Sequence, residues 1–185
     1  MGKTRNKEIT REVLLQYLDY DESTGAFKWK KRELASFSRA QNGISWNGRY
    51  AGKPAFNYIG VGGYRSGKLQ GIKLYAHRVA WMYLYGEWPL GDVDHINRNR
   101  SDNRKENLRL ATRSENIRNS TMHFDSPVGY KGVRKHRSIH GLYEARIYIN
   151  KKMVRIGKFN SAIEAHEAYI AAAEKHFGEF ACGGV

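Results

Sequence analysis

The sequence predicts an α+β protein made of three folded parts and a linker. Residues 91–119 read as strand, loop, strand and helix, and residues 129–178 read as three strands followed by one alanine-rich helix. Residues 1–74 mix a short helix with strand-like runs rich in Gly, Tyr and Lys. We therefore divide the chain into residues 1–74, residues 75–120, a linker at residues 121–128 and a last part at residues 129–185.

The first part is predicted to begin with a helix and to continue as strands. Thr10 can cap a helix that runs through Leu14 and Leu18, and a turn at residues 19–25 precedes a basic strand-like run. Residues 43–74 have no sustained helical period, so we expect a small twisted sheet with loops there. Their aromatic and basic side chains suit stacking or backbone contact with a nucleic acid, although a small aromatic core with a solvated outer face is the favoured interpretation of the aromatic residues. Because basic side chains outnumber acidic ones, we expect residues 1–74 to contact DNA.

The second part is predicted to contain a helix, a strand, a loop, a second strand and a second helix. We expect these elements at residues 75–85, 91–96, 97–105, 107–111 and from 113 onward. Gly86 stops the first helix. Thr112 and Glu115 form a capping-box signature that opens the second helix, which carries Asn116 near its start.

Four polar residues of this second part suggest a shared chemistry. Asp94, His95, Asn107 and Asn116 lie in this order along the chain. A carboxylate and a carboxamide oxygen suit a hard divalent cation, and an imidazole can take a proton from water near neutral pH. Together these residues suggest hydrolysis of a phosphodiester. Taken singly, each of them is more often an ordinary turn or surface residue.

This spacing resembles the HNH nucleases, in particular the phage and intron-encoded homing endonucleases, whose ββα-metal unit is a hairpin followed by a helix. The resemblance implies that His95 is the general base, that Asp94 and Asn116 hold one divalent metal, and that Asn107 braces the loop and orients the histidine. Asn stands at the third position, where many relatives have His, and its carboxamide favours Mg²⁺ or Mn²⁺ over Zn²⁺. His77, on the preceding helix, is a further candidate for the active site, against the alternative of a packed or phosphate-contacting histidine.

The last part is predicted to be a three-stranded antiparallel sheet packed on one helix. Three strand-like runs between residues 129 and 159 are separated by turns at residues 140–141 and 150–151. Ser161 and Glu164 open the helix and Gly178 ends it. In the middle strand, alternation places Ala145 and its apolar neighbours on the helix side. Glu144, Arg146 and Tyr148 lie on the opposite face.

That opposite face is predicted to be cationic, since residues 131–158 hold nine Lys or Arg side chains and one acid. Gly132-Val133-Arg134, the run at residues 156–159 and the alanine-rich helix resemble the Apetala-type DNA-binding domain of plant ethylene-response factors. The resemblance implies that the sheet enters the major groove, where Arg can contact guanine. The candidate DNA contacts are Arg134, Arg146, Arg155, Lys131 and Lys158.

Composition supports a polyanionic partner. The chain has 32 Lys and Arg against 18 Asp and Glu, with a net charge of +14, and phosphate contacts by these side chains release counterions and favour binding. We expect double-stranded DNA, no membrane and no obligate protein partner, because no apolar run reaches the length of a span and no heptad pattern is present. The single cysteine, Cys182, and the absence of a secretory signal favour an intracellular protein.

The expected activity is site-specific cleavage of DNA by a homing-type endonuclease, which would nick as a monomer with one Mg²⁺ or Mn²⁺ per active site. Two alternatives remain open. One is a sequence-specific DNA-binding regulator in which the HNH unit is an inactive scaffold. The other is a nuclease for structured or damaged DNA, or a nonspecific nuclease, which would not depend on one sequence.

Overall fold

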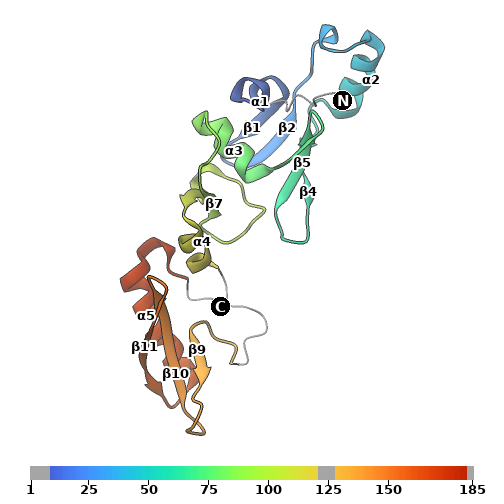
Figure 1. The fold of residues 1–185 in the computed structure, drawn as a ribbon. Coiled ribbons are helices and arrows are strands. Elements are labelled where there is room, and N and C mark those ends of the chain that lie inside the picture. The colour runs from blue at the N-terminus through green and yellow to red at the C-terminus, as the bar shows by residue number, and fades with distance from the viewer. Residues whose placement is uncertain (1–8, 121–127, 183–185) are drawn as a thin grey trace, which may run out of the picture. The chain divides into compact units, whose positions relative to one another are not determined.

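The structure, a computed structural model, describes residues 9–120 and 128–182. The chain forms two compact units, residues 1–110 and residues 111–185, and each is described by itself. Helices and small antiparallel sheets make up both units, which confirms the predicted α+β class (Figure 1). Within the described ranges, no helix is both long and apolar enough to cross a bilayer. The finer division of the chain at residues 74, 120 and 128 stays a prediction.

The first unit opens with a capped helix and a three-stranded sheet. The Thr10 hydroxyl accepts a hydrogen bond from the Val13 amide at 3.5 Å, so the helix begins where the sequence predicts. The strands follow the order β1-β2-β3. The elements are α1 (Arg11–Tyr17), β1 (Leu18–Asp21), β2 (Ala26–Trp29) and β3 (Pro54–Ala55), with a 3₁₀ turn, η1, at Leu34–Ser36.

A helix within the range expected to be sheet and loops corrects the sequence prediction. Helix α2 spans Ala40–Tyr50 and contains two glycines and several other weak helix formers, so its sequence shows little helical signal. Packing supplies what propensity lacks, because the Trp46 ring contacts the rings of Trp29 and Phe37. Gly43 faces Phe37 so closely that an added Cβ would lie 2.7 Å from a ring carbon.

A second sheet, a helix and a hairpin complete the first unit. The second sheet has the order β4-β5-β6, and β7 and β8 form a two-stranded sheet. Helix α3 ends at Gly86, whose φ of 85° suits glycine, as predicted. The bounds are β4 (Tyr58–Ile59), β5 (Arg65–Leu69), β6 (Ile72–Tyr75), α3 (Ala76–Tyr85), β7 (Asp92–His95), η2 (Lys105–Asn107) and β8 (Leu108–Ala111).

One hydrophobic core joins the N-terminal elements to the β7–β8 hairpin. Leu14 and Leu18 come from the N-terminal segment, Val79 from α3, and Val93 and Leu108 from the hairpin, and all of them are buried in one cluster. Complete burial of each such side chain contributes about 1.5–3 kcal/mol. Residues 9–75 therefore stabilise the hairpin that carries Asp94 and His95.

The second unit contains the predicted three-stranded sheet packed on one helix. Its sheet has the order β11-β10-β9 with antiparallel pairing, and α5 packs on all three strands (Figure 1). Ser161 caps α5 by accepting from the Glu164 amide at 3.1 Å. The bounds are α4 (Arg113–Asn119), β9 (Val133–Lys135), β10 (Tyr143–Ile149), β11 (Lys152–Phe159), α5 (Ala162–Phe177) and a final 3₁₀ turn, η3, at Gly178–Phe180.

The two faces of this sheet follow the predicted alternation, but one charged residue of the outer face, Glu144, is buried. Ala145 and Ile147 are buried against α5, together with Ala165 and Tyr169 of the helix. Glu144 lies on the opposite face, yet it is also buried, at 1% exposure. The cause is a group of arginine side chains that cover it. Of the predicted linker, residues 121–127 lie outside the described residues.

Candidate active site

Asp94 and His95 end strand β7 and point to opposite sides of it. Successive side chains of a strand alternate, so the two residues meet different neighbours. The Asp94 carboxylate contacts Arg109 of β8, and the His95 ring contacts Asn103 of the loop that joins the two strands. Both side chains are buried. Although they are neighbours in the sequence, Asp94 contacts a cation and His95 contacts a neutral amide.

Asn103 determines which nitrogen of His95 carries the proton. His95 Nε2 lies 3.1 Å from Asn103 Oδ1, and the amide orientation follows from Asn103 Nδ2, which donates to the Ser101 carbonyl oxygen at 3.4 Å. Since Oδ1 can only accept, Nε2 must donate. In the neutral ring the lone pair then resides on Nδ1, the atom able to take a proton.

The surroundings of His95 favour its neutral form. Burial lowers the pKa of His95 below its usual value, and the hydrogen bond with Asn103 and the negative charge of Asp94 offset only part of this effect. A lowered pKa leaves the imidazole unprotonated near pH 7 and therefore able to act as a base.

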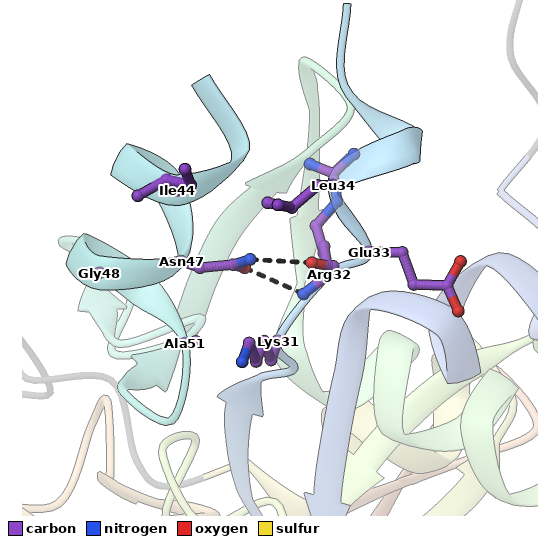
Figure 2. Close-up of a pocket in the computed structure, with 8 residues that line it drawn as sticks. All are labelled: Lys31, Arg32, Glu33, Leu34, Ile44, Asn47, Gly48 and Ala51. Carbon is purple, nitrogen blue, oxygen red and sulfur yellow. Dashed lines mark hydrogen bonds between the residues drawn. The ribbon is translucent and has the colours of Figure 1, made fainter. Parts of the chain in front are cut away.

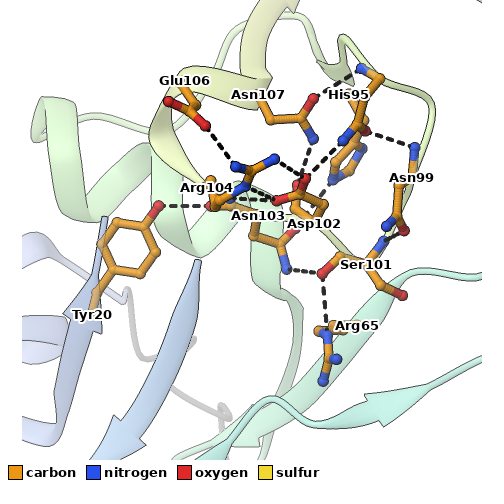
Figure 3. A network of polar contacts seen from close by, with 11 residues as sticks. Tyr20, Arg65, His95, Asn99, Ser101, Asp102, Asn103, Arg104, Glu106 and Asn107 are labelled. Carbon is orange, nitrogen blue, oxygen red and sulfur yellow. Dashed lines mark hydrogen bonds and ion pairs between the residues drawn. The ribbon is translucent and has the colours of Figure 1, made fainter. Parts of the chain in front are cut away.

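Asn107 ties the two ends of the loop together (Figure 3). Its Oδ1 accepts a hydrogen bond from the Asn97 amide at 2.9 Å, and its Nδ2 donates to the Asp102 carbonyl oxygen at 2.7 Å. The Asn107 backbone oxygen also accepts from the Ile96 amide at 2.9 Å. These bonds fix Ile96 and Asn97, which follow His95, relative to Asp102, which precedes Asn103.

Asp102 adds a second polar centre within the same loop. Its carboxylate accepts hydrogen bonds from Asn97 Nδ2 at 2.7 Å and from Arg104 Nε and Nη2 at 2.9 and 2.8 Å (Figure 3). The hydrogen bonds from Arg104 lower the pKa of Asp102 to about 2. The loop is therefore closed by two connected sets of polar bonds, one around Asn107 and one around Asp102, which share Asn97.

The N-terminal hairpins brace this loop from outside. The Tyr20 hydroxyl donates to the Asn103 carbonyl oxygen at 2.7 Å, and Arg65 Nε donates to the Ser101 carbonyl oxygen at 3.2 Å (Figure 3). Gly25 comes so close to the loop that an added Cβ would lie 2.5 Å from the Arg104 nitrogen. The position of Asn103, and through it of His95, depends on residues far away in the sequence.

Asp94 is paired with a buried arginine. Arg109 Nε donates a hydrogen bond to Asp94 Oδ2 at 3.0 Å, and Arg109 Nη2 forms an ion pair with the same oxygen at 2.9 Å. The two side chains are 11% and 6% exposed. The pairing compensates the burial of both groups, because an isolated buried charge would be strongly unfavourable.

His77 lies beside His95 in an aromatic cluster. The two imidazole centroids are 5.3 Å apart, and Tyr64 lies 5.0 Å from His77 and 5.9 Å from His95. Burial lowers the pKa of His77 to about 3, assisted by the charge of Arg78 and by that of His95 when its ring is protonated. His77 Nδ1 has no hydrogen-bond partner among the described residues. The proximity expected for His77 is therefore present, in a ring that stays neutral.

Asn116 belongs to the second compact unit. It lies on α4, whose start shows the complete capping box: Thr112 Oγ1 accepts from the Glu115 amide at 3.3 Å, and Glu115 Oε2 accepts from the Thr112 amide at 2.7 Å. The division between the units follows Leu110. The predicted joint role of Asn116 and Asp94 in holding a metal stays a prediction.

The chemistry of these donors fits a hard divalent cation. Asp94 offers a carboxylate and Asn116 a carboxamide oxygen, which are ligands that Mg²⁺ and Mn²⁺ accept. The part of the chain that the structure describes contains no group of three or more His, Cys, Asp or Glu side chains able to hold a metal.

On the sheet of the second unit, three of the candidate DNA contacts converge on Glu144. Arg134 Nε and Arg146 Nη2 lie 2.8 and 2.6 Å from Glu144 Oε2, and Arg155 pairs with Oε1. Burial alone would raise the pKa of Glu144, but the hydrogen bond of Arg134 and the charge of Arg155 outweigh it and hold the pKa below its usual value. Three cations around one anion leave this face positive.

The two candidate lysines have different surroundings. Lys158 is exposed, next to Glu144 in the sheet register. Lys131 Nζ instead donates to the carbonyl oxygens of Arg118 and Ser120, both at 2.6 Å, at the C-terminal end of α4, where a cation is favourable. The structure thus gives Lys131 a contact that the sequence analysis did not consider.

Asn103, Asp102 and Arg109 are the residues that the sequence analysis missed. Polar residues in an Asn-rich loop usually form turns, and the sequence around Asn103 and Asp102 carries no sign of burial or of contact with His95. Arg109 alone had a readable signal. It lies on a strand between the apolar residues Leu108 and Leu110, and an arginine there can reach the facing strand that carries Asp94.

Two comparisons with known proteins find similarity to HNH endonucleases. Residues 74–118 match the model of the HNH endonuclease family, so the match covers the strand, loop, strand and helix described above. The chain is also 33% identical over 126 residues to a protein of Acanthamoeba polyphaga mimivirus named uncharacterized HNH endonuclease L560. That similarity covers 67% of this chain and 64% of the viral protein. No solved structure matches the chain.

Proposed function

We propose that this chain, which carries an HNH endonuclease segment at residues 74–118, is a site-specific DNA endonuclease of the homing type. The observation that carries the proposal is the buried pair of His95 and Asn103 inside this segment, which leaves a neutral imidazole with a defined tautomer. A buried, oriented and unprotonated histidine next to a carboxylate side chain is what metal-assisted hydrolysis of a phosphodiester needs.

In the proposed reaction, His95 is the general base. Its Nδ1 takes a proton from a water molecule whose oxygen attacks phosphorus, and the bond from phosphorus to the leaving oxygen breaks. Asn103 holds the ring through Nε2, and Asn107 holds the loop that positions Asn103. Asn103 and Asn107 are positioning residues, since neither needs to touch the DNA for this role.

Asp94 and Asn116 would hold one Mg²⁺ or Mn²⁺. When bound, the cation supplies charge stabilisation for the phosphoryl and leaving oxygens. Arg109 pairs with Asp94 and offsets part of the negative charge of the carboxylate. This combination suits a site that holds a single cation, and we propose that each monomer nicks one strand.

Recognition of the target is proposed to belong to the sheet of the second unit. Glu144 fixes Arg134, Arg146 and Arg155 on one face, so these guanidiniums are oriented before DNA arrives. Oriented arginines lose less conformational entropy when they bind phosphates or guanine edges. A separate base-reading surface is needed for site-specific cleavage, because the HNH segment alone makes too few contacts to select a long sequence.

The test is a cleavage assay with supercoiled plasmids that carry candidate targets. The full chain is incubated with Mg²⁺, Mn²⁺ or EDTA, and denaturing gels map any nick. We expect nicking at one position with either metal and none in EDTA. His95→Ala should remove the activity, whereas His176→Ala, an exposed histidine on α5, should leave it unchanged.

Each of the other outcomes would assign a different function to this chain or a different role to His95. Tight, salt-sensitive DNA binding without any metal-dependent cleavage would replace the proposal by a DNA-binding regulator with an inactive HNH scaffold. Cleavage at many unrelated positions would indicate a structure-specific or nonspecific nuclease. Equal cleavage by the parent chain and His95→Ala would remove His95 from the role of base.

A further inference from the structure

A polar cleft in the first unit shares no lining residue with the candidate active site. It has a volume of about 650 Å³ and is lined by Trp29, Arg32, Trp46, Tyr50, Lys68 and Gln70 with their neighbours. Pockets of about 300–1,000 Å³ are typical of sites for small ligands. Two cationic side chains and four aromatic ones, Tyr17 among them, form its walls, and its lining includes no acid.

Arg32 lies among aromatic rings. Its guanidinium carbon is 4.0 Å from the centroid of Phe37, 4.6 Å from that of Tyr17 and 5.2 Å from that of Trp46. Its Nη2 atom donates only long hydrogen bonds, to the Tyr17 and Ser36 hydroxyls at 3.5 and 3.3 Å. Stacking therefore orients the guanidinium and leaves much of its hydrogen-bonding capacity unused.

No carboxylate neutralises the cleft. Neither Arg32 nor Lys68 forms an ion pair with any described residue, whereas many other cations of this unit do, among them Lys30, Arg104 and Lys105. Cationic groups that converge without a counter-charge attract an anion. The lining of the cleft is complementary to a ligand in which an anionic group is joined to a flat ring.

The backbone that carries Arg32 is held in place before any ligand binds. Asn47 of α2 accepts a hydrogen bond from the Arg32 amide through Oδ1 at 2.9 Å and donates one to the Arg32 carbonyl oxygen through Nδ2 at 2.8 Å (Figure 2). The neighbouring hollow shown in Figure 2, of about 560 Å³, shares Arg32 with the cleft. Helix α2 thus supplies both the stacking ring of Trp46 and the clamp on Arg32.

We propose that this cleft binds one unpaired nucleotide of a DNA strand. The base would stack on Trp46 or Tyr50, and the adjoining phosphates would lie against Arg32 and Lys68. Stacking on aromatic side chains combined with backbone cations is how proteins hold single-stranded nucleic acid without reading its sequence. A base within a duplex cannot reach these rings, because both of its faces are covered by neighbouring base pairs.

The inference deepens the proposed function, since it takes the ligand to be the DNA on which the nuclease acts. A pocket for an unpaired nucleotide would hold DNA that is locally opened near the cutting site or already carries a free strand. It gives the N-terminal region a role in substrate binding in addition to its structural role around the 97–107 loop.

Binding of a short, labelled oligothymidylate to the full chain, measured by fluorescence anisotropy in EDTA, tests the inference without requiring cleavage. The cleft variant is the double substitution Tyr50→Ala, Lys68→Ala, and both residues are exposed enough to leave the fold intact. The matched control is Tyr58→Ala, Lys53→Ala, an aromatic and a lysine of the same unit outside the cleft lining. Binding of a fully paired duplex is measured in parallel.

We expect the cleft variant to bind the oligothymidylate at least about tenfold more weakly than the parent chain, while the control stays within about twofold. Duplex binding should change by the same small factor in both variants. Equal oligothymidylate affinities of the cleft and control variants would overturn the inference. So would a loss of duplex binding as large as the loss of oligothymidylate binding. If nicking is absent but the cleft variant is impaired, the inference stands and the proposed nuclease fails.

Discussion

His95 Nε2 lies 3.1 Å from Asn103 Oδ1, and both side chains are buried. This pair connects strand β7 to the loop at residues 97–107 and, through that loop, to strand β1. Asn103 belongs to the loop that Asn107 closes, and its backbone carbonyl accepts a hydrogen bond from Tyr20 of β1. Through these contacts, the N-terminal hairpin helps to hold the residue that bonds to the proposed base.

Replacement of Asn103 by alanine should reduce nicking without abolishing it. The variant leaves Nε2 of His95 without its acceptor, so the ring loses its fixed tautomer and orientation, an effect of about 10–100-fold for such positioning residues. Single-turnover nicking rates at saturating protein measure this step. Asn99→Ala, an exposed position in the same loop, is the control. An unchanged rate in Asn103→Ala would show that the hydrogen bond does not position the base.

Acid should destabilise the first unit partly through Asp102. Its pKa in the folded protein is about 2, below the usual 3.8, so its stabilising effect is complete above about pH 4 and is lost as the pH falls from about 4 towards 2. After allowance for solvent screening, the contribution is about 1–2 kcal/mol. Urea unfolding followed by tryptophan fluorescence reports this unit alone, since all four tryptophans lie within residues 1–110.

The comparison that isolates Asp102 uses Asp102→Asn. The difference in unfolding free energy between the parent chain and this variant should shrink as the pH falls from about 5 towards 2. The comparison covers the pH values at which both proteins are still folded. Asp19→Asn, at an exposed carboxylate paired with Lys30, should show a much smaller difference at every pH. A difference for Asp102→Asn that stays constant with pH would contradict the lowered pKa.

Gly25→Ala should destabilise the first unit and slow nicking. An added Cβ would lie 2.5 Å from the Arg104 nitrogen, and the φ of 69° is itself unfavourable for alanine. Gly71→Ala separates these causes, because its φ is 86° and nothing lies within 4 Å of the added Cβ. We expect a cost of about 1 kcal/mol for Gly71→Ala and about 2 kcal/mol more for Gly25→Ala, measured by the same urea unfolding. Similar costs for both would mean that the loop yields to the added methyl group.

Glu144→Gln should loosen the sheet of the second unit. The substitution keeps the shape of the side chain but leaves Arg134, Arg146 and Arg155 without their shared anion, and breaking a buried ion pair costs about 3–5 kcal/mol. Hydrogen exchange of the β9–β11 amides measures the local opening. Glu167→Gln, at an exposed position on α5, should have no effect. Unaltered protection in Glu144→Gln would show that the arginines do not need Glu144 to hold the sheet.

Local rules predicted most of the elements and the order of the site residues. The capping pairs Thr112 with Glu115 and Ser161 with Glu164, and the glycine stop at Gly86, act over three to four residues, and the structure has all of them. Helix α2 was missed because its residues are weak helix formers and its stability comes from rings that contact it from other segments.

By itself, the sequence determined the order of strands and helices in residues 91–119 and 129–178, and it determined the basic charge. It also determined that Asp94, His95, Asn107 and Asn116 follow one another in the order of an HNH segment. Each of these features depends only on neighbouring residues or on composition. Only the tertiary structure decided which side chains these residues meet. Tyr20 and Asn103 are separated by 83 positions, and the three arginines around Glu144 come from three different strands. Such contacts follow from the way packed elements bring distant segments together, and no local pattern encodes them.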